Sequence, residues 1–121
     1  QNSGIETELI VSADLEQMEF DPSVETQLMR IVQEALTNVR KHARAQRVRI
    51  HFKVNHDQAQ IEIVDNGKGF DSVNLSLKDG QHFGQRIMRE RAEEIGGAVD
   101  VQSAINQGTR VLINVPLQKA A

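Results

Sequence analysis

The chain has 121 residues, of which 39% are apolar and 26% charged, a balance that suits one domain with one core. Its net charge of −3 argues against a nucleic-acid binder, which normally carries a surplus of basic residues. It has no cysteine, so disulfides and thiolate metal sites are excluded. No apolar run approaches the roughly 20 residues that cross a bilayer, and no signal-peptide pattern is visible.

The first half of the chain predicts a strand, a long helix and a hairpin. Residues 5–12 are rich in apolar side chains and are bounded by glycine and aspartate, which indicates a strand. Asp21 and Pro22 form a helix start, and the apolar residues of 23–43 recur at helical period. Apolar and polar residues then alternate over 48–54 and 59–65, as in two strands with one buried face.

The second half opens with a polar, glycine-containing loop at 66–81, long enough to be functional or disordered. A helix is expected over about 83–95, ended by two glycines. Alternating strands follow at 99–101 and 111–115 around a Gln-Gly turn. Antiparallel strands with helices between them predict an α+β sandwich, one sheet with helices on one face.

A polar row on the first helix is one candidate site. Spacings of four and three place Glu34, Asn38 and Lys41 within about 60° of each other, with His42 nearer the apolar stripe. An acid, an amide and an ammonium there suit a hydrated Mg²⁺ and phosphate oxygens, because Mg²⁺ prefers oxygen ligands and keeps waters. The alternative is a solvated flank of the helix.

A second candidate follows a strand, at Asp65, Gly67, Gly69 and Phe70. The glycines permit close approach of the backbone, and a carboxylate at a strand end suits an amino group such as that of adenine. The alternative is an ordinary Asn-Gly turn.

Two shorter candidates come later in the chain. Gly84, Gln85 and Arg86 stand at the expected start of the second helix, where free backbone N–H groups form an anion site. Thr109 lies in a Gly-Thr-Arg segment that enters the last strand. By themselves these segments also fit a glycine-initiated helix with a surface arginine and a simple turn.

The order of these segments carries a resemblance. The chain contains EALTNVRKH at 34–42, DNGKGF at 65–70, FGQRIMRERA at 83–92 and GTR at 108–110. They resemble the N, G1, G2 and G3 boxes of the ATP-binding domain of histidine kinases and of the wider GHKL superfamily. IVQEALTNVRKHARA and IMRERAEEIGG are similar to the nitrate/nitrite-sensor and DesK-like subfamily.

The resemblance implies roles for the polar row on the first helix. Asn38 would coordinate Mg²⁺, and Lys41 and His42 would approach the phosphates or the ribose. Many histidine kinases have Asn at the first position of the N box, where this chain has Glu34. The wider superfamily uses an acid there as a general base, which makes Glu34 a candidate for that role.

The resemblance also implies how the base would be held. Asp65 would accept a hydrogen bond from the adenine N6 amino group, Gly67 and Gly69 would shape the turn beneath the base, and Phe70 is a further ATP-binding residue. Thr109 would support Asp65, directly or through water.

The phosphate end would involve the loop at about 66–82, which corresponds to the ATP lid. Gly84, Gln85 and Arg86 would hold the end of the lid and the phosphate tail. This G2 box is reduced, since Gly84 is its only glycine, and no clear F box is visible.

The resemblance implies one two-layer sandwich of the Bergerat type over residues 1–121, with a mixed sheet, helices on one face and an ATP lid. Because the chain begins at Gln1, we expect a piece of a longer protein. The resemblance implies a cytoplasmic domain, whose parent protein can be anchored in a membrane. The parent would bind Mg-ATP and donate the γ-phosphoryl to a histidine on a separate dimerisation domain, for relay to a response regulator. Homodimers are expected only for the full-length protein. The alternatives are an anti-sigma-factor-type serine kinase and a docking module without nucleotide competence.

Overall fold

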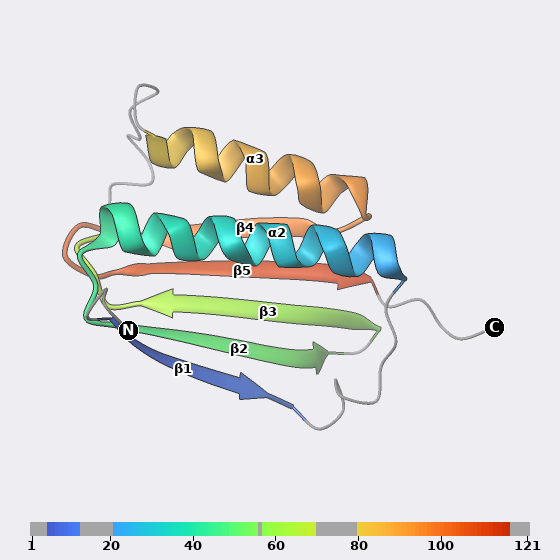
Figure 1. Cartoon of the computed structure of the whole chain (residues 1–121), viewed down its shortest axis with the longest axis horizontal. Coiled ribbons are helices and arrows are strands. Elements are labelled where there is room, and N and C mark those ends of the chain that lie inside the picture. Colours follow the sequence, from blue (N-terminus) through green and yellow to red (C-terminus); the bar gives the residue numbers. More distant parts are fainter. Residues whose placement is uncertain (1–4, 13–20, 56, 70–79, 117–121) are drawn as a thin grey trace.

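The computed structural model describes residues 5–12, 21–55, 57–69 and 80–116, with the backbone alone at 42, 43, 55 and 80–84. Within these residues one five-stranded sheet forms a layer and the helices form a second layer over one of its faces (Figure 1). The predicted α+β sandwich is confirmed.

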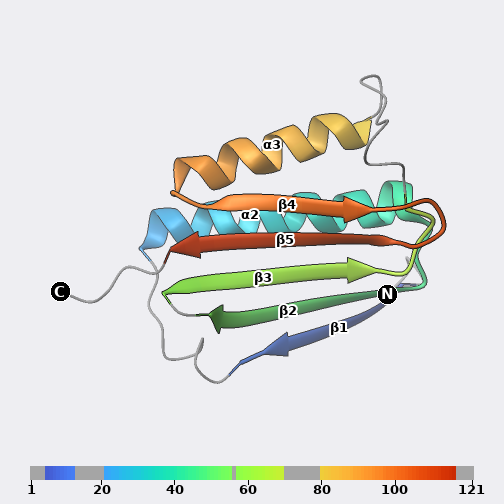
Figure 2. The same cartoon turned by 180° about the vertical axis from the view of Figure 1, so that it is seen from behind.

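Each predicted element is present, with some changes of boundary. In chain order the elements are β1 (Glu6–Val11), α2 (Pro22–Asn38), the π-helical turn η1 (Val39–Ala43), β2 (Arg47–Asn55), β3 (Gln58–Asp65), α3 (Gly80–Glu94), β4 (Ala98–Ser103) and β5 (Thr109–Pro116). The strand order is β1-β2-β3-β5-β4. Among the described strands, only β1 and β2 run parallel to each other, so the sheet is mixed. Figure 2 shows β4 in front of α2.

Helix α2 begins where the sequence predicts. The Asp21 carboxylate accepts hydrogen bonds from the Ser23 backbone N–H at 2.9 Å and from its hydroxyl at 2.7 Å, and Pro22 occupies the first turn. These hydrogen bonds hold the pKa of Asp21 below its ordinary value. The apolar stripe of α2 packs on the sheet through Leu28, Ile31, Val32 and Ala35.

The core follows the alternation of the strands. Ile61 and Ile63 of β3 point toward the helices, and Ile63 pairs with Ile50 of β2 and Val111 of β5. Met88 of α3 closes the core from above and is fully buried. The same alternation places Asp65, the last residue of β3, on the helix-covered face.

The opposite face of the sheet is polar. Arg47 and Arg49 of β2 pair with Glu6 and Glu8 of β1, while Glu62 of β3 pairs with Arg110 of β5. Among the described residues no helix is long and apolar enough to cross a membrane.

Two boundaries differ from the prediction. The first helix changes to a π-turn, η1, after Asn38. The spacing that placed Lys41 beside Glu34 assumed an unbroken α-helix, so it does not apply here. Helix α3 begins at Gly80 rather than near Phe83, so residues 80–82, which we assigned to the lid, are helical. Residues 70–79 of the predicted lid lie outside the described residues.

Candidate functional site

Asp65 is one of two buried polar or charged side chains among the described residues, with 6% of its surface exposed. The Gly67 backbone N–H donates to its Oδ1 at 2.8 Å. Burial raises the pKa of the Asp65 carboxyl, while hydrogen bonds from the backbone N–H groups of Gly67 and Thr109 act in the opposite direction. Asp65 is therefore a largely buried acceptor that backbone hydrogen bonds hold in place. The expected support from Thr109 is made by its backbone.

The segment after Asp65 is tied to two neighbouring parts of the fold. The Asn66 side-chain oxygen accepts the backbone N–H groups of Gln46 at 3.0 Å and Arg47 at 2.9 Å. The Lys68 carbonyl accepts the Asn106 backbone N–H at 2.6 Å. The predicted Asn-Gly turn is thus anchored to the start of β2 and to the β4–β5 turn.

Gly69 shows why glycine is needed in this segment. Its φ is +62°, and a Cβ built on it would lie 2.1 Å from the Ala104 carbonyl oxygen. The close approach to the β4–β5 turn therefore excludes any side chain at this position.

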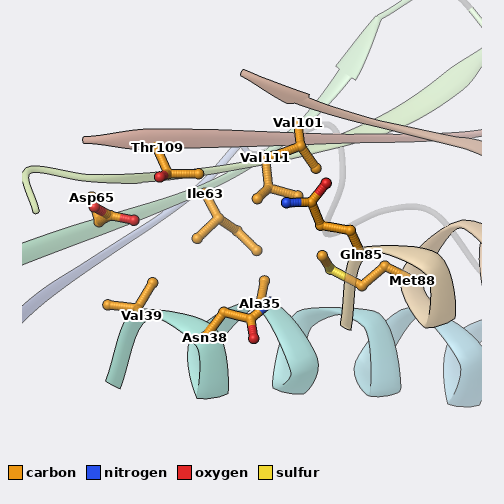
Figure 3. Close-up of a pocket in the computed structure, with 10 residues that line it drawn as sticks. All are labelled: Ala35, Asn38, Val39, Ile63, Asp65, Gln85, Met88, Val101, Thr109 and Val111. Atoms are coloured by element: carbon orange, nitrogen blue, oxygen red, sulfur yellow. The ribbon is translucent and has the colours of Figure 1, made fainter. Parts of the chain in front are cut away.

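A cavity opens beside Asp65, between α2, α3 and the sheet (Figure 3). Its walls are mostly apolar: Ala35, Val39, Ile63, Met88, Val101 and Val111. Four polar residues also line it: Asn38, Asp65, Gln85 and Thr109. An apolar slot with a few polar groups suits a flat, partly polar ligand such as a nucleotide base.

Asn38 is the last residue of α2, directly before η1, and it lines the cavity on the side opposite Asp65 (Figure 3). The Val39 N–H is shared between the carbonyls of Ala35 and Leu36, where the α-helical hydrogen bonding changes. A π-turn frequently marks a functional position in a helix, because it redirects the residues beside it.

The second helix presents Gln85 to the cavity and Arg86 to its outer surface. Gln85 is 6% exposed, whereas Arg86 is exposed and donates to Glu90 at 3.4 Å. Gly84 lies in the second turn of α3, where backbone N–H groups bond to carbonyls four residues earlier. The expected anion site of free N–H groups at Gly84–Arg86 is therefore wrong, because the helix starts earlier.

The other predicted residues lie away from the cavity lining or outside the described side chains. Lys41 is exposed on η1, and Glu34 is half-buried on α2 without lining the cavity. His42 and Gly84 are described by their backbone alone, and Phe70 lies outside the described residues.

Sequence reasoning missed the apolar residues that line the cavity. Ile63, Val101 and Val111 were expected as strand residues with a buried face, and Met88 as a buried helix residue. Nothing in the alternation separates a residue that faces a ligand from one that faces the core. The one available signal was proximity in sequence to Asp65 and Thr109, at the strand ends.

Fold and site together define a class of protein: an α/β sandwich that binds a ligand between its helices and one end of its sheet. The model of the histidine kinase-, DNA gyrase B- and HSP90-like ATPase family matches residues 23–119, and the chain belongs to this family.

Curated relatives agree with this assignment. The chain is 39% identical over 106 residues to the sensor histidine kinase LiaS of Bacillus subtilis, covering 86% of this chain and 28% of the relative. It is 37% identical over 106 residues to the sensor protein VraS of Staphylococcus saprophyticus, covering 88% of this chain and 30% of the relative. The chain thus spans less than a third of the length of these relatives.

Solved structures show the same fold. The histidine kinase domain of the Erythrobacter litoralis EL346 blue-light activated histidine kinase superposes with a TM-score of 0.76 at 23% identity, over 94% of this chain and 52% of that chain. A mycobacterial sensor histidine kinase, MprB, superposes with a TM-score of 0.72 at 24% identity, over 98% of this chain and 85% of that chain. At these sequence identities the comparison with solved structures shows the fold alone.

Proposed function

We propose that this chain is the ATP-binding catalytic domain of a two-component sensor histidine kinase. The observation that carries the proposal is a buried carboxylate, Asp65, at the end of an apolar cavity that Asn38 lines from the opposite side. An ionised carboxylate only accepts hydrogen bonds. It therefore favours adenine, whose C6 carries an amino group, over guanine, whose C6 carries a carbonyl oxygen.

The apolar walls support binding of a flat base. Ile63 and Val111 stand on the sheet and Met88 on α3, so a ring inserted between the layers contacts apolar surface on both of its faces (Figure 3). Asp65 would hold the base at its edge, and Thr109 would contact it on the side of the sheet.

The proposal includes Mg²⁺, with the side-chain oxygen of Asn38 as its ligand from the protein. No group of three or more His, Cys, Asp or Glu side chains among the described residues could hold a metal by itself. A single amide oxygen is enough where the phosphates and waters supply the other ligands, since Mg²⁺ keeps several waters. The ion would neutralise charge on the triphosphate. Lys41 and His42, on η1, would add positive charge or hydrogen bonds on the phosphate side.

In the longer protein, the domain would donate the γ-phosphoryl to a histidine on a separate dimerisation domain, for relay to a response regulator. Phosphoryl transfer depends mainly on positioning and charge neutralisation, the roles that this proposal gives to Asn38, Lys41 and His42. Glu34 would act as a general base. The similarity to LiaS and VraS supports this role, and the motif pattern supports the nitrate/nitrite-sensor and DesK-like subfamily.

Titration calorimetry tests the proposal. The wild-type chain should bind ATP in the presence of Mg²⁺ and should bind GTP at least about tenfold more weakly. Asn38→Asp should chiefly change the Mg²⁺ dependence of ATP binding and leave adenosine binding unaltered. If ATP produced neither heat nor a thermal shift, the result would support the alternative of a docking module that lacks nucleotide competence.

The serine-kinase alternative has the same fold and is separated by the sequence that precedes this chain. Dimerisation helices with a histidine would exclude it, and a natural methionine close upstream would favour it.

A further inference from the structure

Gln85 has an environment unusual for an amide. It and Asp65 are the two buried polar or charged side chains among the described residues, and both line the same cavity. Figure 3 shows the Gln85 side chain extending from α3 toward the sheet, so that its amide points into the space between the two layers.

A buried amide needs hydrogen-bond partners. Its NH₂ group offers two donors and its oxygen accepts, and leaving such groups unpaired away from water is costly. Within the part of the chain that the structure describes, the Gln85 amide forms no side-chain hydrogen bond, although Asn66 and Gln60 do. The buried side-chain atoms without a partner among the described residues do not include those of Gln85, so its amide meets solvent in the cavity, where a ligand can take the place of the solvent as hydrogen-bond partner.

The residues around Gln85 indicate whether its amide would contact the base or the phosphates of a nucleotide. Gln85 shares its stretch of the cavity with Met88, Val101 and Val111, all apolar. A triphosphate placed among them would lose its hydration without a charged partner, at a large cost in free energy. A base keeps its apolar faces against these side chains and presents polar atoms only at its edge.

We propose that Gln85 is a specificity-determining residue that reads the edge of the bound base, together with Asp65. The inference rests on the proposed function and replaces the expectation that Gln85 holds the phosphate tail. A carboxamide presents a donor and an acceptor side by side, which matches an amino group beside a ring nitrogen, as on adenine. Asp65 accepts from the amino group, and the Gln85 NH₂ donates to a ring nitrogen next to it.

The test compares Gln85→Leu with Gln33→Leu, the same change at an exposed position of α2. Gln85→Leu should weaken ATP and adenosine binding by the same factor, about fivefold, because the lost hydrogen bond is to the base in both ligands. Its melting temperature without ligand should not fall, since the change removes a buried polar group. Gln33→Leu should bind both ligands as the wild type does.

Two analogues locate the contact. Adenosine lacking the ring nitrogen N1 (1-deaza) or N7 (7-deaza) removes one acceptor at a time. One of them should bind the wild type more weakly than adenosine does, and this loss should disappear in Gln85→Leu, which is the signature of a direct pair.

Each contrary result has a definite meaning. If Gln85→Leu weakens ATP but not adenosine, Gln85 contacts the phosphates and the inference is overturned. If it changes neither affinity, or neither analogue is coupled to the substitution, the inference is also overturned, while the proposed function stands. If the wild type binds no adenine ligand, the proposed function itself fails.

Discussion

The Asp65 carboxylate stands in surroundings that disfavour its charge but suit its proposed ligand. Burial raises its pKa, and the Gly67 and Thr109 N–H groups only partly compensate. An amino group from adenine would supply a further donor where the protein provides few. The buried carboxylate thus lowers the stability of the free domain but offers a hydrogen-bond acceptor to a ligand. Such a trade-off between stability and function is common at binding sites.

Asp65→Asn should therefore stabilise the free protein and weaken ligand binding. Because the folded pKa lies above the ordinary value of 3.8, ionisation of Asp65 lowers stability above the folded pKa and has no effect well below 3.8. The melting temperature of Asp65→Asn should exceed that of the wild type at pH 7, and the gap should close as the pH falls toward 4. ATP affinity should fall about tenfold or more. A variant that melts lower at pH 7 would contradict this account.

At the level of single residues, three residues that the sequence motifs single out, Asn38, Asp65 and Thr109, line one cavity, while their contacts with ATP stay predictions. The motifs did not predict that Gln85 is buried: it lies three residues before Met88, on the face of α3 that covers the sheet, where an apolar residue is expected. The exposed Arg86 agrees with the alternative of a surface arginine. Contacts of a ligand with Lys41, and with the segment 70–79, remain predictions.

Among the elements, the β4–β5 turn controls the position of Asp65. Gly108 has a φ of +75°, and a Cβ on it would lie 2.1 Å from the Asp65 carbonyl oxygen. Gly96, at the end of α3, has a similar φ of +74°, but a Cβ there would meet only the Pro116 ring, at 3.6 Å. The two glycines share a left-handed backbone conformation and differ in the clash that a side chain would meet.

This pair gives a matched experiment. Gly96→Ala should reduce the free energy of unfolding by about 1 kcal/mol, the cost of a left-handed backbone for alanine. Gly108→Ala should cost about 3 kcal/mol or more and should also weaken ATP binding, because β3 must move away together with Asp65. Denaturant unfolding and calorimetry measure both effects. Equal losses of stability in the two variants would show that the turn does not press on Asp65.

The ion pair between Glu62 and Arg110 joins β3 to β5 on the polar face. The Arg110 hydrogen bond lowers the pKa of Glu62, whose side chain is 20% exposed. By contrast, the side chains of Glu8 and Arg49 are 53% and 58% exposed, so solvent screens that pair. Only the first pair is expected to contribute measurably to stability.

Glu62→Gln should destabilise the domain by about 1 kcal/mol at pH 7, and Glu8→Gln by less than about 0.5 kcal/mol. Because the folded pKa of Glu62 is lowered, its contribution is present above the ordinary value of 4.5 and is lost as the pH falls through the folded pKa. The difference between Glu62→Gln and the wild type should therefore shrink below pH 4.5 in thermal melts. A difference that stays constant with pH would refute the assignment.

The type of each element could be predicted because period-two and period-3.6 patterns are strong in this chain. The π-turn η1 could not, since its residues continue the apolar stripe of α2, with Val39 buried like Ala35. The start of α3 at Gly80 was missed because glycine and polar residues signal a loop locally, whereas the helix is held by buried Met88 and Ala92 further on.

For the whole molecule, the sandwich class followed from the order of elements, but the neighbours of each strand did not. The pairing of β3 with β5 joins Asp65 to Thr109, 44 positions apart in the chain, and depends on packing beneath two helices. The parallel pairing of β1 with β2 needs a crossover through α2. These long-range pairings bring the G1 and G3 segments to the same end of the sheet.

The arrangement of the layers also bears on phosphorylation by this chain alone. Among the four histidines, the structure describes the side chain of His51, which lies on the polar face of the sheet near Glu62. The cavity lies on the other face, so the sheet itself separates His51 from a nucleotide bound there. The remaining histidines, His42, His56 and His82, lie outside the sequence context of a phosphoacceptor helix.

The isolated chain should therefore bind ATP without phosphorylating itself. Incubation with γ-labelled ATP and Mg²⁺ should leave the protein unlabelled under conditions in which calorimetry shows the site to be occupied. Labelling that survives in His51→Gln would point to another acceptor in this chain, and labelling that disappears would implicate His51. Either form of labelling would refute the proposal that the acceptor histidine lies on a separate domain. Absence of labelling together with measured binding is the result that a nucleotide-holding domain predicts.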